Sequence, residues 1–166
     1  MRNRPFAAAV AALALAAPAT ASARPMDFPE DRSFVVNAAH SNLAEIATGR
    51  LALRESDDTA VRAFARRMIT DHTAAQAKLR AVARAWDTRL PSRPSPTQRR
   101  DAARLAALEG EAFDRAYLRR QIVAHRQTLG ICLLEIDAGR VANVRAYAAE
   151  TAPVVRTHLT LAKATR

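Results

Sequence analysis

Residues 59–86, TAVRAFARRMITDHTAAQAKLRAVARAW, decide the fold. Their apolar positions recur in alternating steps of four and three, the period of a helix that buries one face in a bundle. This stripe consists of Val61, Ala65, Met68, His72, Ala75, Leu79, Val82 and Trp86. One member is a histidine, and an imidazole that faces a core needs a hydrogen-bond partner or a metal ion.

Two later segments repeat the pattern, and each again includes a histidine. The first stripe is Leu118, Ile122, His125, Leu129, Cys132 and Ile136, and the second is Val144, Ala148, Thr151, Val155, His158 and Ala162. One inward histidine is common in a core. Three of them, on three separate helices, predict a shared polar site.

Period, capping residues and helix breakers together predict four long helices. We expect them over about 33–55, 59–86, 111–137 and 141–163. Asp31 and Ser33 are candidate caps of the first helix, and Asp57 and Asp58 suit the start of the second. Gly139 is a natural stop for the third. Period-two alternation has little support, so the sequence predicts an all-α fold.

The connection between the second and third long helices defines the architecture. Pro91, Pro94 and Pro96 make residues 87–97 an extended crossover, and a short helix over about 98–108 follows it. Two αα-hairpins joined by a long crossover with a short extra helix are typical of the ferritin-like four-helix bundle.

The N-terminus has the pattern of a secretory signal peptide. Arg2 and Arg4 precede an apolar run over 6–17, and Ala21-Ser22-Ala23 is a small-x-small cleavage site. The run is shorter than the ~20 residues that span a bilayer. We therefore expect residues 1–23 to be a cleavable signal peptide, with cleavage after Ala23 and export to the periplasm. Residues 24–32 would then form a flexible arm, and 33–166 a helical domain with no transmembrane segment.

Charge and cysteine content narrow the possible partners. The formal net charge of +10 falls to +8 when the signal peptide is removed. The arginines are spread along every helix with acids between them, and the chain carries an export signal, so we expect no nucleic-acid partner. An anionic envelope surface or a protein partner remains compatible with this charge. Cys132, the single cysteine, cannot form an internal disulfide and should be buried.

Helix geometry places the candidate site residues near one level. At ~1.5 Å per residue, His72 lies roughly 22 Å and Glu45 roughly 18 Å from the turn near residue 57. His125 and His158 lie roughly 21 Å and 28 Å from the turn near residue 139. All four therefore fall near the middle of helices that are some 40 Å long. Glu45 lies at the flank of its stripe among small residues, where a sheltered carboxylate and a solvated one are both compatible with the sequence.

Several short motifs together resemble a known bacterial family. They are Leu43-Ala44-Glu45-Ile46-Ala47, Gly49-Arg50-Leu51-Ala52, Met68-Ile69 with Asp71-His72-Thr73, the run Gly110 to Leu118, His125, Pro153 and His158-Leu159. The chain resembles the exported family called domain of unknown function 4142, which is grouped with ferritin-like folds. The resemblance implies that fold over nearly the whole mature chain, and it implies no catalysed reaction. Ala124 and Leu133 stand where members of this family often carry acids, which leaves few carboxylates for a di-iron or mineralising site.

Two functions follow from these residues. The first is a structural or stress-related envelope protein, in which the histidines form a polar core layer by bonding one another, Asp71 or Tyr117. The second is a bundle that binds one zinc, copper or iron ion through His72, His125, His158 and, at the flank, Glu45. The Glu-x-x-His motif of di-iron bundles is absent, because Ile69 and Val155 stand three residues before His72 and His158. No nucleophile motif is present either, so the sequence predicts no catalytic residue.

Overall fold

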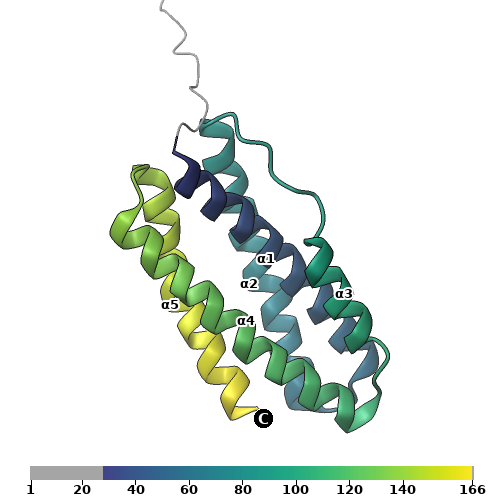
Figure 1. Ribbon diagram of the computed structural model, residues 1–166. Helices are drawn as coiled ribbons and strands as arrows, with labels where there is room; N and C mark the ends of the chain where they lie inside the picture. The colour runs from purple at the N-terminus through teal and green to yellow at the C-terminus, as the bar shows by residue number, and fades with distance from the viewer. Residues whose placement is uncertain (1–27, 166) are drawn as a thin grey trace, which may run out of the picture.

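The computed structural model describes residues 28–165 of the chain and consists of helices and their connections there, without a strand (Figure 1). The helices are α1 (Pro29–Glu55), α2 (Thr59–Ala85), α3 (Pro96–Leu105), α4 (Gly110–Ala138) and α5 (Ala142–Ala164). The all-α prediction is therefore confirmed for this part of the chain. The expected signal peptide, its cleavage after Ala23 and residues 24–27 of the expected arm lie outside the described residues.

The four long helices form two hairpins that pack against each other. α1 packs along α2, and α4 packs along α5, with the most extensive contacts in the molecule. The hairpins meet through α1 against α4 and α2 against α5, while the short α3 lies against α1 and α4 (Figure 1). The extended crossover after α2 runs outside the hairpins before it enters α3.

The core consists of two apolar clusters with a polar layer between them. One cluster contains Phe34, Leu79 and Val144, and the other contains Met68 and Phe113. On every long helix, buried polar side chains lie in the sequence between the residues of the two clusters. They are Asn42, Glu45, Thr48, His72, Gln76, His125 and His158, and Gln121 is buried one turn before His125. The layer is thus near mid-height, where the helical rise predicts it.

The hairpin α1–α2 is tight because small residues lie at its contact. A Cβ built on Gly49 would come within 2.9 Å of Ile69 Cγ1 and 3.1 Å of the Ala65 carbonyl oxygen. The glycine therefore lets the backbones approach more closely than any side chain would allow.

Helix starts depend on local caps. The sequence predicted the start of α2 correctly, but not the starts of α3 and α1. Asp58 caps α2, because its Oδ1 accepts from the amides of Ala60 and Val61 at 2.8 and 2.9 Å. α3 begins at Pro96, two residues before the expected start, because Ser95 and Gln98 form a reciprocal capping box. It also ends at Leu105, three residues earlier than expected.

The start of α1 and the role of Asp31 were predicted wrongly. α1 begins at Pro29, so residues 29–32 are helical and are not part of a flexible arm. Asp31 does not cap α1. Its Oδ1 accepts from the amides of Arg140 and Val141, at 3.0 and 2.8 Å, immediately before α5. Ile136, expected in the core, is 38% exposed, so the stripe of α4 is not buried as far as its last turn.

Candidate metal centre

His72, His125 and His158 converge in the polar layer from α2, α4 and α5. Their side chains are 5%, 2% and 1% exposed. One candidate ligand nitrogen from each lies within 4.8 Å of the other two, and the ring centroids are 5.3–5.7 Å apart. Three nitrogens on one tetrahedral zinc ion would be roughly 3.3 Å apart, since each Zn–N bond is about 2.0–2.1 Å long. Modest side-chain rotations would close that difference. We call these three residues the histidine cluster.

Each ring in the cluster is oriented by a hydrogen bond from its outer nitrogen. His72 Nδ1 lies 2.9 Å from the side-chain oxygen of Asn42. The Asn42 amide is itself fixed, because its Nδ2 donates to Gln76 Oε1 at 3.2 Å and to the Tyr147 hydroxyl at 3.1 Å. The amide oxygen that faces His72 can only accept, so His72 Nδ1 carries the proton.

The other two rings have acceptors of the same kind. His125 Nδ1 donates to the backbone carbonyl oxygen of Gln121 at 2.8 Å. His158 Nε2 donates to Asp71 Oδ2 at 2.8 Å, and Asp71 is also bonded by Arg67 at 3.2 Å. Carbonyl and carboxylate partners for the outer N–H are the usual support of metal-binding histidines, because they fix the tautomer and raise the basicity of the inner nitrogen.

The inner nitrogens are the unusual part of the site. His72 Nε2, His125 Nε2 and His158 Nδ1 are buried, and none has a hydrogen-bond partner among residues 28–165. In a neutral imidazole whose other nitrogen donates, the remaining nitrogen carries a lone pair. Three lone pairs therefore face one another in the core, and each buried acceptor left without a donor costs about 1–3 kcal/mol.

The surroundings keep two rings of the cluster, His72 and His158, uncharged. Burial, and then the positive charge that His125 and His158 would carry, lower the pKa of His72 well below its usual range. Burial also lowers the pKa of His158, although its hydrogen bond to Asp71 opposes that shift. Both rings are therefore neutral at pH 7, which is the form that binds metal ions.

A small cavity connects the cluster with the outside of the hairpins. It has a volume of about 170 Å³ and lies between α2 and α5, where Asp71, His72, Thr151 and His158 line it. Lys78 and Glu150 form an exposed ion pair of 2.8 Å at its wall. The cavity therefore borders two of the three histidines of the cluster.

Glu45 is not brought into the cluster. Its side chain is only 5% exposed, so the solvated alternative is wrong, and its Oε2 has no hydrogen-bond partner in the described part of the chain. It lines a separate cavity bounded by α1, α3 and α4. Its negative charge raises the pKa of Tyr117 further than burial alone does. The three histidines thus meet without the fourth candidate.

The remaining titratable residues lie away from the cluster. His40 is half-buried and contacts the Arg93 carbonyl oxygen through Nδ1 at 3.0 Å, which agrees with a structural role. Cys132 is buried, as expected, and burial raises the pKa of its thiol to about 11, which makes it inert at neutral pH. Glu135 lies beside Asp31 at the end of α4, where burial and the Asp31 charge raise its pKa to about 7.

Sequence reasoning missed the supporting amides. Asn42 and Gln76 were not predicted as parts of the site, although Asn42 lies four residues after Ala38 on the inward face of α1. Gln76 follows His72 by four residues on the inward face of α2. Polar residues at inward positions one turn from a candidate ligand were the signal that could have found them.

Comparison with known families agrees with this fold and leaves the activity open. A sequence profile described as Domain of unknown function (DUF4142) matches residues 15–165. The chain belongs to the DUF4142 family. No curated protein matches this DUF4142 protein. None of its helices among the described residues is long and apolar enough to cross a membrane.

Two solved structures share the fold of this DUF4142 protein. The first, a DUF305 fragment from Deinococcus radiodurans, has a TM-score of 0.74 and 20% identity, over 84% of this chain and 97% of that one. The second is a DUF305 protein from Streptomyces coelicolor, provisionally described as secreted. It has a TM-score of 0.69 and 15% identity, over 80% of this chain and 88% of the other. At these identities the likeness concerns the fold alone.

Proposed function

We propose that this protein binds a single zinc or copper ion through the histidine cluster, in a ferritin-like four-helix bundle. The observation that carries the proposal is the set of three converging inner nitrogens, each a buried lone pair without a donor in the described part of the chain. A divalent ion would satisfy all three at once. The outer nitrogens already have the acceptors that hold metal-binding imidazoles in place.

The donor set favours zinc or copper over iron. Imidazole suits both metals, whereas non-haem iron sites commonly add a carboxylate to two histidines. Glu45 is outside the cluster, and Asp71 bonds the outer nitrogen of His158. Three histidine ligands also leave a fourth tetrahedral position for water or a small molecule, as in catalytic zinc sites. Nothing in the chain identifies a substrate for that position.

A purely structural role for the polar layer is the competing function. It expects the histidines to bond one another, Asp71 or Tyr117. Only the His158–Asp71 bond of that expected set is present within residues 28–165, and the Tyr117 hydroxyl has no partner there. The inner nitrogens instead have no partner among the residues that the structure describes, which a layer that only stabilised the fold would be expected to avoid.

We further propose that the protein is exported to the periplasm after cleavage behind Ala23. The residues of the N-terminal pattern and the secreted description of the Streptomyces coelicolor protein support this. Mass spectrometry of the protein from a periplasmic extract should give a chain that begins at Arg24. A chain that begins at Met1 would contradict export with cleavage.

Thermal unfolding of metal-free, untagged protein tests the metal site. Added Zn²⁺ or Cu²⁺ should raise the melting temperature of the wild type, because a ligand of the folded state stabilises it by mass action. His125→Ala should lose most of that gain, whereas His40→Ala, outside the cluster, should keep it. The gain should also fade as the pH falls below about 6.5 toward the lowered pKa values of His72 and His158, since protons then compete for the imidazoles. If the metal shifts the melting temperature of wild type and His125→Ala equally, or shifts neither, the metal site is contradicted and the structural role is supported.

A further inference from the structure

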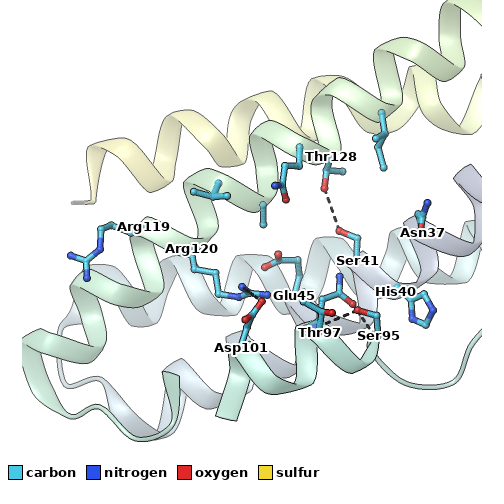
Figure 2. A pocket seen from close by; sticks show the side chains of 16 residues that line it. Asn37, His40, Ser41, Glu45, Ser95, Thr97, Asp101, Arg119, Arg120 and Thr128 are labelled. Atoms are coloured by element: carbon cyan, nitrogen blue, oxygen red, sulfur yellow. Dashed lines mark hydrogen bonds and ion pairs between the residues drawn. The ribbon is translucent and has the colours of Figure 1, made fainter. Parts of the chain in front are cut away.

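A second cavity lies apart from the small cavity between α2 and α5 that borders the histidine cluster. Its volume is about 600 Å³, and α1, α3 and α4 form its walls (Figure 2). We call it the α1–α3–α4 pocket. This volume lies in the range of pockets that hold small organic molecules.

The carboxylate of Glu45 is the buried charge at the inner wall of this pocket. Figure 2 shows the side chain extending from α1 into the space between α3 and α4. It is 95% buried, and its Oε2 has no partner among the residues that the structure describes. A buried carboxylate without donors is costly, so a ligand that brings N–H donors and a positive charge would be stabilised there.

The other charges at the pocket do not neutralise Glu45. Arg120 is paired with Asp101 through an ion pair of 2.8 Å between α4 and α3. Arg119 points away from Glu45 in Figure 2. His40 lies at the far end, where its ring contacts a backbone carbonyl oxygen. Glu45 is therefore the buried charge of the lining that has no ion pair among residues 28–165, which favours a cationic group beside it.

Beside the apolar side chains of Ala44, Val123, Ala124 and Ile131, the rest of the lining presents hydroxyl and amide groups. Ser41 and Thr128 face each other with their oxygens 3.3 Å apart, and Thr97 and Gln127 lie nearby on α3 and α4. Such groups both donate and accept, so they match the hydroxyls of a ligand better than an alkyl chain.

We propose that the α1–α3–α4 pocket binds a small hydroxylated primary amine, of the amino-sugar type. Its ammonium group donates to the Glu45 carboxylate, and its hydroxyls exchange hydrogen bonds with the Ser41, Thr97 and Thr128 side chains. The site is separate from the histidine cluster and does not depend on a bound metal.

The proposal can be tested by NMR titration of ¹⁵N-labelled protein with glucosamine. The expected result is saturable shifts of amides along the pocket walls in α1, α3 and α4. N-acetylglucosamine and glucose, which lack the positive charge, should bind at least about tenfold more weakly, as expected when one charge-assisted hydrogen bond is lost. Equal binding of all three sugars, or no saturable shift with glucosamine, would overturn the proposal.

Two variants locate the site. Glu45→Gln should weaken glucosamine binding by about tenfold or more, whereas Glu150→Gln, an equal change of charge on the exposed face of α5, should leave it unchanged. Ala124→Leu keeps the Glu45 carboxylate but places a larger side chain in the pocket from α4. It should therefore also weaken glucosamine binding by about tenfold or more. It provides the independent test if Glu45→Gln does not fold. Wild-type affinity in Ala124→Leu or in folded Glu45→Gln would refute this location.

Discussion

Replacement of Asn42 tests how the histidine cluster is oriented. The Asn42 side chain is 4% exposed and makes three hydrogen bonds, to His72, Gln76 and Tyr147. Asn42→Ala removes all three and leaves the Nδ1–H of His72 without its acceptor. At about 0.5–1.5 kcal/mol for each bond, we expect the metal-free protein to lose about 2–4 kcal/mol of stability.

The same substitution should weaken metal binding. Loss of the residue that orients a ligand histidine typically costs about 10- to 100-fold in metal affinity. Competition with a chromophoric chelator measures the zinc affinity, and urea unfolding of metal-free protein measures the stability. Tyr147→Phe is the matched control, because it removes one bond to Asn42 and leaves the Asn42–His72 bond in place. It should lower stability by about 0.5–1.5 kcal/mol and keep an affinity close to that of wild type.

The two readouts separate a metal site from a structural layer. If Asn42→Ala lowers stability but binds zinc as tightly as wild type does, then Asn42 does not orient a ligand and the reasoning about tautomers is refuted. If Tyr147→Phe weakens zinc binding as much as Asn42→Ala does, the effect comes from general loosening of the core.

Three further substitutions test the packing and the electrostatics of the fold. Leu79→Ala should cost ~2–5 kcal/mol in urea unfolding, because Leu79 is 0% exposed in the core, and a loss below about 0.5 kcal/mol would show that the stripe is misassigned. Gly49→Ala should cost about 1–3 kcal/mol, because its Cβ would lie 2.9 Å from Ile69 Cγ1, and an unchanged melting temperature would contradict this close helix contact. Glu135→Gln should stabilise the protein by about 1–3 kcal/mol above pH 7. Its folded pKa of about 7 exceeds the unfolded value of 4.5, so the wild-type carboxyl is destabilising once ionised. The gain should shrink as the pH falls toward 4.5, and a gain that does not change with pH would refute this cause.

The sequence predicted the helices and the convergence of His72, His125 and His158 because both depend on local geometry. The period of 3.6 residues fixes which side chains face inward, and the rise of about 1.5 Å fixes their height. Two hairpins with short turns then bring mid-helix residues to one level. The polar layer between two apolar clusters has this origin.

Features that depend on the relative rotation of helices could not be predicted from the sequence. Glu45 lies at the flank of its stripe, and its neighbours depend on how closely α1 approaches α3 and α4. The structure places it at the α1–α3–α4 pocket and outside the histidine cluster. Asp31 shows the same limit, because its partners Arg140 and Val141 lie 109 and 110 residues away in the chain. No local pattern reports such a contact.

X-ray absorption spectroscopy of zinc-loaded protein, prepared without a His-tag, tests the central claim most directly. The account predicts one ion per chain, with about three imidazole nitrogens at ~2.0–2.1 Å and a light fourth ligand. The three-imidazole scattering pattern should no longer be seen in His125→Ala. A spectrum of six oxygen ligands, a sulfur ligand at ~2.3 Å, or an unchanged spectrum in His125→Ala would contradict it.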